Sequence, residues 1–400
     1  MAATALSRTA SPEADAIPVP AGTEPLGLTV HDSLAAAEGV WRELETRGVF
    51  TPYQRFDWIA HWVAAQAETP RLAILCIEQA GRPVALLPLA IERHLGIRQA
   101  TIIGSDIGNA DWMLLDPAAA PLFTRARIAR LLAAGAKRAG GIDLVALFNQ
   151  PESWRGISNP LLAFPHQEGP NDLHFGSLNE RGTFDLLDAK RLGHLLRRKR
   201  KLAEAHGEVV LRTAGTIEEI DRFHRVFLEQ RGARFAQLGI ANVFAEPHFV
   251  RFFRAGAVAS LGAPRPAILL QALFAGEEIV ATACGTFAGD HYSQYINATA
   301  GGEVAKYRLI GILMHEIFAD VARRGGTSID MGLGAFEYKD DWTVRVPVYD
   351  SIIPLTPAGR LAGSAILKAR EVKRAIKRHD RLWALAKRVR ALLRARPAPA

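Results

Sequence analysis

Apolar and polar residues alternate along this chain in a plan that occurs twice. Short apolar runs of strand length are joined by Gly-containing turns, and a longer stretch with helical spacing precedes a last apolar run. Because this order recurs about 195 residues later, we predict two related α/β units. The predicted strands are 71–78, 84–92, 99–104 and 142–148, with a helix at 121–139, and then 267–274, 279–287, 291–298 and 327–331, with a helix at 304–323.

Helical sequence precedes each unit, at 34–47 and 57–66 and again at 191–206 and 217–231. Between the units, 149–179 is rich in Pro, Gly, Asn and His and predicts a loop-rich connector with room for a strand or two. The fold class is therefore α/β, with mixed central sheets flanked by helices. The predicted divisions are a disordered leader (1–25), an N-terminal unit (26–182), a C-terminal unit (183–355) and a basic amphipathic helical tail (356–400).

Composition and charge narrow the class of protein. Half of the 400 residues are hydrophobic and 22% are charged, which is typical of a globular protein of two domains. The net charge of +8 is concentrated near the C-terminus, where 359–396 carries 13 Lys or Arg against two acidic residues. The remainder is slightly acidic, so we expect no nucleic-acid partner. The leader lacks an apolar segment and predicts no signal peptide.

The two cysteines, Cys76 and Cys284, each lie within an apolar strand-like run. A buried, inert thiol is the favoured interpretation for both, and two such residues make neither a disulfide framework nor a metal site. We therefore expect no metal and a cytoplasmic location.

The segment Arg308-Leu309-Ile310-Gly311 opens a predicted helix directly after a strand and a small-residue bend. The first N–H groups of a helix lack internal partners, and a glycine there lets a phosphate approach the backbone. A buried helix whose glycine serves close packing explains the same four residues equally well.

Several segments in a fixed order resemble the GNAT acyltransferase superfamily, and more narrowly the CelD type associated with cellulose and exopolysaccharide biosynthesis, a relative of the FemAB transferases. These segments are the basic run 195–201, the turn and strand 276–281, the helix start 307–311, and the closing segments 330–334 and 337–339; upstream, 52–58 and 104–111 fit the same proteins. The resemblance covers about 26–345 and implies tandem GNAT-like units. The superfamily's phosphate loop ends in Gly or Ala, whereas this chain has Leu313.

The resemblance implies that the second unit binds acetyl-CoA or another acyl-CoA. Arg308, Leu309 and Gly311 would then hold the pyrophosphate, and the strand residues Tyr295, Ile296 and Asn297 would pair with the pantetheine arm.

Three residues near the end of the second unit are the candidate catalytic groups. Asp330 closes an apolar strand and is a candidate general base, although capping of the following loop is as probable. The resemblance implies that Tyr338 protonates the leaving thiolate and that Lys339 stabilises negative charge. Without the resemblance, Lys339 reads as a surface lysine.

The acceptor has two candidate binding regions. Asp106, Asp111 and Trp112, with Asn109 between them, lie in one loop and resemble a sugar-stacking set as much as an ordinary surface loop. Arg198, in the basic run, would bind an anionic sugar, or else belongs to a solvated helix face.

The expected function is transfer of an acetyl or other acyl group from CoA to an amine or hydroxyl of a small or saccharide-pathway acceptor. Two alternatives stay open: a FemAB-like aminoacyl transferase, and a degenerate transferase that serves as a scaffold in a polysaccharide machine. The tail, with Leu382, Leu385, Val389 and Leu392 at helical spacing, predicts contact with this protein itself, a partner or an anionic membrane surface through 360–396.

Overall fold

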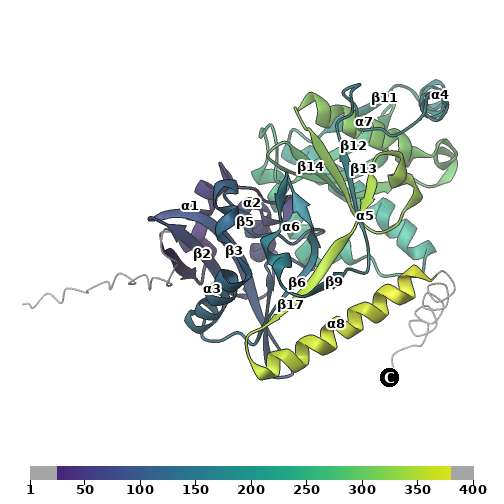
Figure 1. Cartoon of the computed structure of the whole chain (residues 1–400). Coiled ribbons are helices and arrows are strands. Elements are labelled where there is room, and N and C mark those ends of the chain that lie inside the picture. The colour runs from purple at the N-terminus through teal and green to yellow at the C-terminus, as the bar shows by residue number, and fades with distance from the viewer. Residues whose placement is uncertain (1–24, 380–400) are drawn as a thin grey trace, which may run out of the picture.

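The structure is a computed structural model that describes residues 25–379. Two large sheets carry helices on their faces, so the predicted α/β class is confirmed (Figure 1). The leader and the apolar positions of the tail beyond His379 lie outside the described residues.

The first sheet has eight strands, in the order β1-β2-β3-β4-β6-β17-β9, with β5 paired to β3. Only β4 and β6 run parallel, and the other neighbours are antiparallel. Its elements are β1 (Leu26–His31), α1 (Leu34–Glu45), η1 (Pro52–Gln54), α2 (Phe56–Ala65), β2 (Arg71–Gln79), β3 (Arg82–His94), β4 (Ile97–Ile102), β5 (Leu114–Leu115), η2 (Pro117–Leu122), α3 (Arg125–Arg138), β6 (Leu144–Pro151), η3 (Pro160–Ala163), β9 (His166–Glu168) and β17 (Val348–Pro354), and a small hairpin is formed by β7 (Ser153–Trp154) and β8 (Ile157–Ser158).

The second sheet has seven strands, in the order β11-β12-β13-β14-β15-β10-β16, and its one parallel pair is β14 with β15. Its elements are β10 (Leu173–Ser177), α4 (Ala189–His206), β11 (Val209–Thr213), α5 (Ile217–Gln237), η4 (Val243–Ala245), α6 (Pro247–Ala259), β12 (Leu269–Ala275), β13 (Glu278–Ala288), β14 (His291–Thr299), η5 (Gly302–Tyr307), α7 (Leu309–Arg323), β15 (Ser328–Leu333), η6 (Glu337–Asp341) and β16 (Val344–Val346).

Strands are exchanged between the halves, which corrects the predicted boundaries near 182 and 355. β10, assigned to the first unit, pairs with β15 in the second sheet. β17, assigned to the second unit, pairs with β6 in the first sheet. The connector 149–179 does contain short strands, as the sequence allowed, but pairing between segments so distant in sequence leaves no local signal of the sheet that each strand joins.

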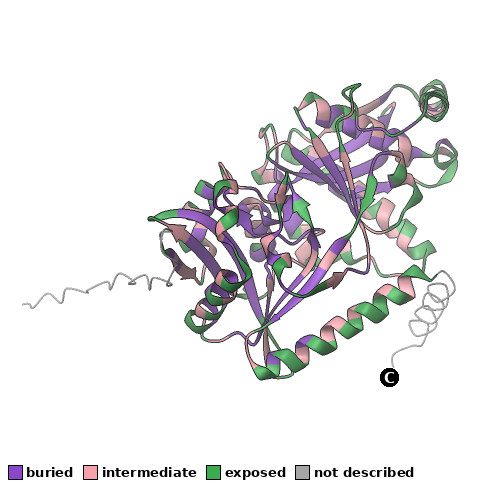
Figure 2. Ribbon diagram, viewed as in Figure 1, coloured by how far each residue is buried: buried purple, intermediate pink, exposed green. Residues whose placement is uncertain are grey.

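The hydrophobic core joins the two halves. Helices α2 and α6 pack together, and the ring of Trp58 meets that of Phe252 at 4.9 Å between centroids. The same cluster of buried side chains includes Tyr53 from the first half and Ile268 from the second. Figure 2 shows buried residues running through both sheets and the region where the halves meet. This shared core fixes one half relative to the other.

Local sequence explains the start of helix α5 and a register shift within strand β13. Thr216 caps α5 by accepting from the Glu219 N–H at 3.2 Å, while the Glu219 carboxylate accepts from the Gly215 N–H at 2.7 Å. In β13 the register shifts next to Gly285, where a Cβ would lie 2.0 Å from the Tyr292 hydroxyl. Glycine there makes room for the Tyr292 ring.

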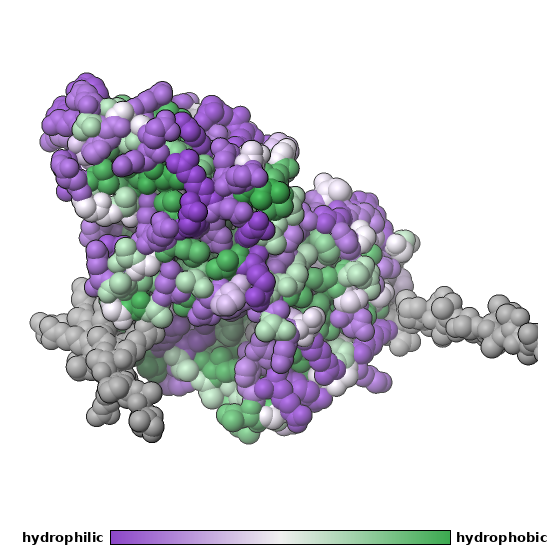
Figure 3. Space-filling model, turned by 180° about the vertical axis from the view of Figure 1, so that it is seen from behind, coloured by the Kyte–Doolittle hydropathy of each residue, from purple (hydrophilic) through white to green (hydrophobic). Residues whose placement is uncertain are grey.

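Helix α8 (Pro357–Arg378) crosses beneath both halves and confirms the basic C-terminal helix as far as the structure describes it (Figure 1). Arg370 forms an ion pair with the fully buried Asp350 of β17. No helix within residues 25–379 combines the length and apolar character needed to cross a membrane. Seen from behind, hydrophilic side chains dominate the second half's surface, with hydrophobic ones in scattered patches (Figure 3).

Candidate active site

The N-terminus of α7 presents backbone N–H groups without a side-chain cap. The helix begins at Leu309 and not at 304 as predicted, because 302–307 forms the 3₁₀ turn η5 and Arg308 adopts a left-handed conformation (φ 53°). No acidic residue lies in the first turn. Left-handed backbone is costly for a residue with a Cβ and is concentrated at functional sites. This end of α7 is therefore electrostatically suited to an anion.

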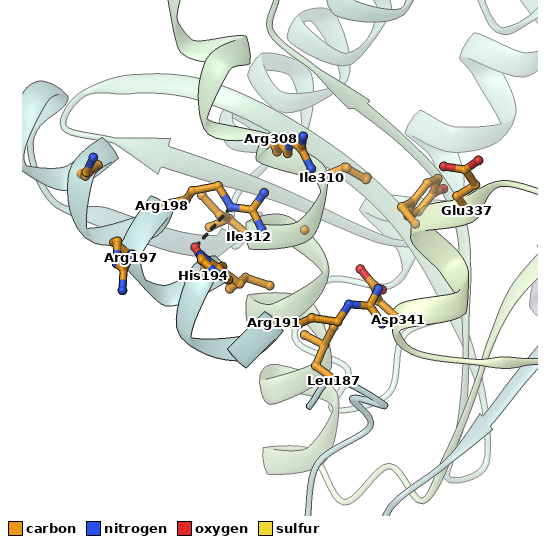
Figure 4. Close-up of a pocket in the computed structure, with 14 residues that line it drawn as sticks. Leu187, Arg191, His194, Arg197, Arg198, Arg308, Ile310, Ile312, Glu337 and Asp341 are labelled. Carbon is orange, nitrogen blue, oxygen red and sulfur yellow. Dashed lines mark hydrogen bonds and ion pairs between the residues drawn. The ribbon is translucent and has the colours of Figure 1, made fainter. Parts of the chain in front are cut away.

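A cationic face of α4 lies opposite that helix start. Arg191, His194, Arg198 and Lys201 recur at helical spacing and line one cavity of about 630 Å³ together with Arg308. Figure 4 shows Arg198 on α4 and Arg308 at the start of α7 on facing elements. The other lining residues are Leu187, Leu195, Arg197, Ile310, Gly311, Ile312, Glu337, Tyr338 and Asp341.

The charges in this first cavity are only partly balanced. Arg191 pairs with Asp341, and Lys199, just behind the face, anchors α4 to α7 through Glu316 at 2.7 Å. The pKa of Arg198 is lowered, chiefly by burial and then by the positive charge of Arg308. Cations held close to each other favour a ligand with several negative charges.

Packing within the protein does not require glycine at position 311. A Cβ built there would meet only Leu195 Cδ1, at an ordinary contact distance of 3.6 Å. The sequence left packing and phosphate binding as equal explanations for Gly311. The structure favours phosphate binding, because the free space above Gly311 opens into the cationic cavity.

A second cavity of about 640 Å³ lies where β14 and β15 separate. These parallel strands pair only from His291 to Ser293 with Ser328 to Asp330, and beyond that point no pairing joins them. Tyr295, Ile296 and Asn297 line the gap, as do residues 105–109 of the first half. The exposed edge of β14 can pair with an amide-bearing chain.

Tyr338 and Ile310 line both cavities, so the two are adjacent. The Tyr338 hydroxyl accepts from Asn297 Nδ2 at 3.4 Å, and burial raises the pKa of its phenol. Leu309 is different: it is buried in the core, so only its backbone belongs to the helix start.

Lys339 is a buried wall residue of the second cavity and not a surface lysine. The residue is 4% exposed, and its Nζ donates to the carbonyl oxygens of Leu333 at 2.9 Å and Gly334 at 3.3 Å. Burial lowers the pKa of this ammonium to about 8. A cation is thus held at the cavity with little competing solvent.

The structure contradicts the prediction that Asp330 takes a proton directly from a substrate. Its carboxylate is fully buried, lines neither cavity, and accepts hydrogen bonds from His291 Nε2 at 3.0 Å, Ser293 Oγ at 2.9 Å and the Gly332 N–H at 2.8 Å. The sequence predicted that Asp330 closes a strand, whereas it lies inside β15, where β10 pairs alongside it. The covering by β10 and by the first half was not visible in the sequence.

Two of the predicted acceptor-binding residues are also structural. Asp111 Oδ2 accepts from Ser105 Oγ and from the Phe148 N–H, both at 2.8 Å, and burial raises the pKa of this carboxyl to about 7. Trp112 is 1% exposed and donates from Nε1 to the Val49 carbonyl oxygen at 3.2 Å. Both are buried and neither lines either of the two cavities described above, which argues against the sugar-stacking interpretation for this pair.

Asp106 and Arg198 line different cavities. Asp106 reaches the second cavity, where desolvation raises the pKa of its carboxyl even though the residue is exposed at the opening. Arg198 belongs to the first cavity with Arg308, away from any acceptor bound beside Asp106. The spacing of Arg191, His194 and Lys201 along α4 was the signal that would have identified this cationic face from sequence.

Other residues of the second cavity could not be found from sequence. Arg231 and Arg234 of α5 line it, and Tyr53 lies behind Asn109. Within residues 25–379, no group of three or more His, Cys, Asp or Glu side chains is arranged to hold a metal ion.

Residues 190–340 match the family model of the acetyltransferase (GNAT) domain. This match covers less than half of the chain. A search of curated proteins found none that matches the chain. The structure of FemX resembles this one with a TM-score of 0.59 at 10% identity, over 84% of this chain and 99% of that one. A conserved protein of unknown function from Bacteroides thetaiotaomicron gives a TM-score of 0.51 at 9% identity, over 82% and 99%. At these identities the likeness establishes a shared fold. The matched region includes most of the residues that line the two cavities, but residues 105–109 of the second cavity lie outside it.

Proposed function

We propose that this protein transfers an acyl group, acetyl in the simplest case, from CoA to the amine or hydroxyl of a small acceptor. The observation that carries the proposal is the continuity of two sites. An uncapped helix N-terminus faced by α4 cations opens, past Tyr338, into the gap between β14 and β15. A CoA molecule has the same succession of parts: phosphates, an amide-bearing arm and a thioester.

The first cavity suits the phosphates. Arg308, Arg198 and Lys201 supply cations, and the space above Gly311 allows a phosphate to reach the α7 N–H groups. Leu313 follows where the superfamily has Gly or Ala, but it is fully buried in the core and faces away from the cavity. The departure from the family pattern thus leaves the proposed phosphate site open.

The second cavity suits the thioester and the acceptor. The free edge of β14 from Tyr295 onward pairs with the two amides of the pantetheine arm. The acyl thioester supplies an activated carbonyl carbon, which the acceptor's neutral amine or hydroxyl attacks directly. The products are an amide or ester and free CoA thiol, with one proton released to solvent when an ammonium is the starting form.

Tyr338 and Lys339 perform the two chemical tasks of the chain in this proposal. The phenol of Tyr338, between the cavities, donates its proton to the departing sulfur and regains one from solvent. The Lys339 ammonium stabilises the negative charge that develops on the carbonyl oxygen. Asp330, buried and hydrogen-bonded to His291, Ser293 and Gly332, takes no part in the proton transfer of this proposal.

An acceptor from saccharide metabolism and a place beside the CelD-type proteins remain part of the proposal, supported by the sequence resemblance. The likeness to FemX over most of both chains keeps aminoacyl transfer as the second candidate. Calorimetric titration separates the two. Binding of acetyl-CoA, weakened at least tenfold in Gly311→Trp, supports CoA-dependent transfer, whereas no binding by a folded wild-type protein contradicts it.

A further inference from the structure

The second cavity carries more positive than negative charge. Three cationic side chains line it, Arg231, Arg234 and Lys339, against a single carboxylate, Asp106. Lys339 is held by two backbone carbonyls. Arg231 and Arg234 lie on one face of α5, about one turn apart, and this face forms one wall of the cavity. This distribution fits an anion at α5.

Arg231 is fixed in place without a carboxylate partner. Its Nη1 donates to the Asn297 carbonyl oxygen at 3.0 Å, and its guanidinium lies over the rings of Phe235 and Phe244. Nε is buried and has no hydrogen-bond partner within the described part of the chain. Burial lowers the pKa of this side chain, and Arg234 lowers it further. Nε itself is covered by the protein, but a desolvated guanidinium without a carboxylate partner is costly unless an anion in the cavity balances its charge.

Arg234 and Asp106 are also free to bind a ligand. Neither side chain forms an ion pair with another residue between 25 and 379, although both line the same cavity. Arg234 comes from α5, whereas Asp106 comes from the loop after β4 in the first half. Unpaired charges of opposite sign in one cavity complement a ligand that has both signs.

We propose that the acceptor is an amine that also carries an anionic group, a carboxylate or a phosphate. Arg231 and Arg234 bind the anion, and Asp106 receives the ammonium before it is acylated. The inference rests on the proposed function, because the cavity is taken to hold the acceptor beside the thioester. It adds the class of acceptor, which neither the fold nor the GNAT domain match specifies.

The test compares amino sugars that share one amine and differ in charge. Glucosamine is the neutral parent, glucosamine 6-phosphate adds a phosphate, and muramic acid adds a carboxylate. Saturation-transfer NMR measures their binding to the full chain in the presence of saturating CoA, and thiol release from acetyl-CoA measures transfer. We expect at least one anionic amine to bind at least tenfold more tightly than glucosamine.

Two variants on α5 locate the anion. In Arg234→Gln the preference for the anionic amine should fall below threefold while the Kd for CoA is unchanged. Arg225→Gln, on the exposed side of the same helix beside Glu229, should keep the full preference. In Asp106→Asn the charged and neutral amines should lose affinity by the same factor.

The remaining outcomes each count against a distinct claim. Equal binding of all three amines, or binding of no anionic amine, by protein that binds CoA would overturn the acceptor class and leave the proposed function intact. Loss of CoA affinity in Arg234→Gln would assign the arginines to the CoA phosphates and likewise overturn the inference. Failure of wild-type protein to bind CoA would overturn the proposed function and this inference with it.

Discussion

The hydroxyls of Tyr53 and Ser293 lie 2.5 Å apart across the junction of the two halves. Asn109 Nδ2 donates to the Tyr53 hydroxyl at 2.6 Å, and Ser293 donates to Asp330 at 2.9 Å. An amide nitrogen only donates and a carboxylate only accepts, so the Tyr53 O–H must donate to Ser293. A series of hydrogen bonds, each with a defined donor, therefore joins the first half to the buried Asp330, the last residue of β15 that pairs with β14. Asn109, at the other end, lines the second cavity.

Removal of the Tyr53 hydroxyl should loosen the junction. Tyr53→Phe keeps the ring contacts with Trp58 and Tyr295 but removes the hydrogen bonds that the hydroxyl forms with Ser293 Oγ and Asn109 Nδ2. Ser293 keeps its bond to Asp330, whereas Asn109 Nδ2 is left without a partner among the described residues. We expect the free energy of unfolding, measured by urea denaturation, to fall by about 1–3 kcal/mol. Tyr349→Phe is the control, because the Tyr349 hydroxyl forms no hydrogen bond with any described residue. Equal stability of the two variants would contradict the account.

Gly311 should be dispensable for folding and required for CoA. In Gly311→Ala the free energy of unfolding should stay constant or rise by up to about 1 kcal/mol, because the added methyl has space and alanine favours helices. The Kd for CoA should rise at least tenfold.

Gly135 in α3 provides the matched case of a packing glycine. A Cβ there would lie 2.6 Å from Leu75 Cδ2, so Gly135→Ala should cost about 1–3 kcal/mol and leave CoA affinity unchanged. Calorimetry and urea denaturation of both variants check the contrast. A destabilised Gly311→Ala with normal CoA affinity would restore the packing explanation for Gly311.

Substitution of Asp111 should change the free energy of unfolding and leave the binding of acetyl-CoA and the rate of transfer unchanged. Its folded pKa of about 7 exceeds the unfolded value near 4, so folded protein binds an extra proton between these values and wild-type stability falls as pH rises through that window. Asp111→Asn lacks this loss, and its amide oxygen can accept both hydrogen bonds now made to Oδ2. Relative to wild type, the variant should gain roughly 2–4 kcal/mol between pH 5 and pH 8.5, since one pKa unit is about 1.4 kcal/mol.

Urea denaturation at the two pH values tests this prediction. Because Asp111 lines neither cavity, acetyl-CoA affinity and the transfer rate should be unchanged in Asp111→Asn. A loss of acceptor binding in this stable variant would instead support the original interpretation of the loop as a sugar site.

Lys339 should set an alkaline limit on transfer. Burial lowers its pKa to about 8, so above this pH the ammonium is lost and the rate should decline. Between pH 8 and about 10.4 the unfolded state holds a proton that the folded state has released, so wild-type stability rises with pH relative to Lys339→Met. The variant should lose about 100-fold in kcat at pH 7 and show no inflection near pH 8. A variant with normal kcat would remove Lys339 from the chemistry.

The sequence predicted the parts of the fold that depend on local pattern. The hairpin of β12 and β13, the strand β14 and the C-terminal end of helix α7 lie within two residues of their predicted bounds, because apolar period and turn glycines are local signals. The exchange of β10 and β17 between sheets depends on partners far away in the chain. Helix α6 and strand β11 were missed as well.

For the candidate site, the sequence identified residues with suitable chemistry but could not show which of their side chains reach a cavity. Arg308, Gly311 and Tyr338, named from the pattern and the family resemblance, line cavities, while their binding and catalytic roles stay predictions. Asp330 and Trp112 have equally suggestive neighbours in sequence, yet both are covered by chain segments from elsewhere. Arg231 carries no local sign of function, because its role depends on α5 lying beside β14.

The most direct test of the central claim is calorimetric titration of CoA into wild-type protein, Arg198→Gln and Arg200→Gln at two salt concentrations. Arg198 lines the first cavity, whereas Arg200 is an exposed neighbour on α4 beside Glu204. We predict one CoA per chain, weaker binding at higher salt, and an affinity loss of at least fivefold for Arg198→Gln with none for Arg200→Gln. No binding to wild-type protein, or equal losses in the two variants, would contradict a CoA site between α4 and the start of α7.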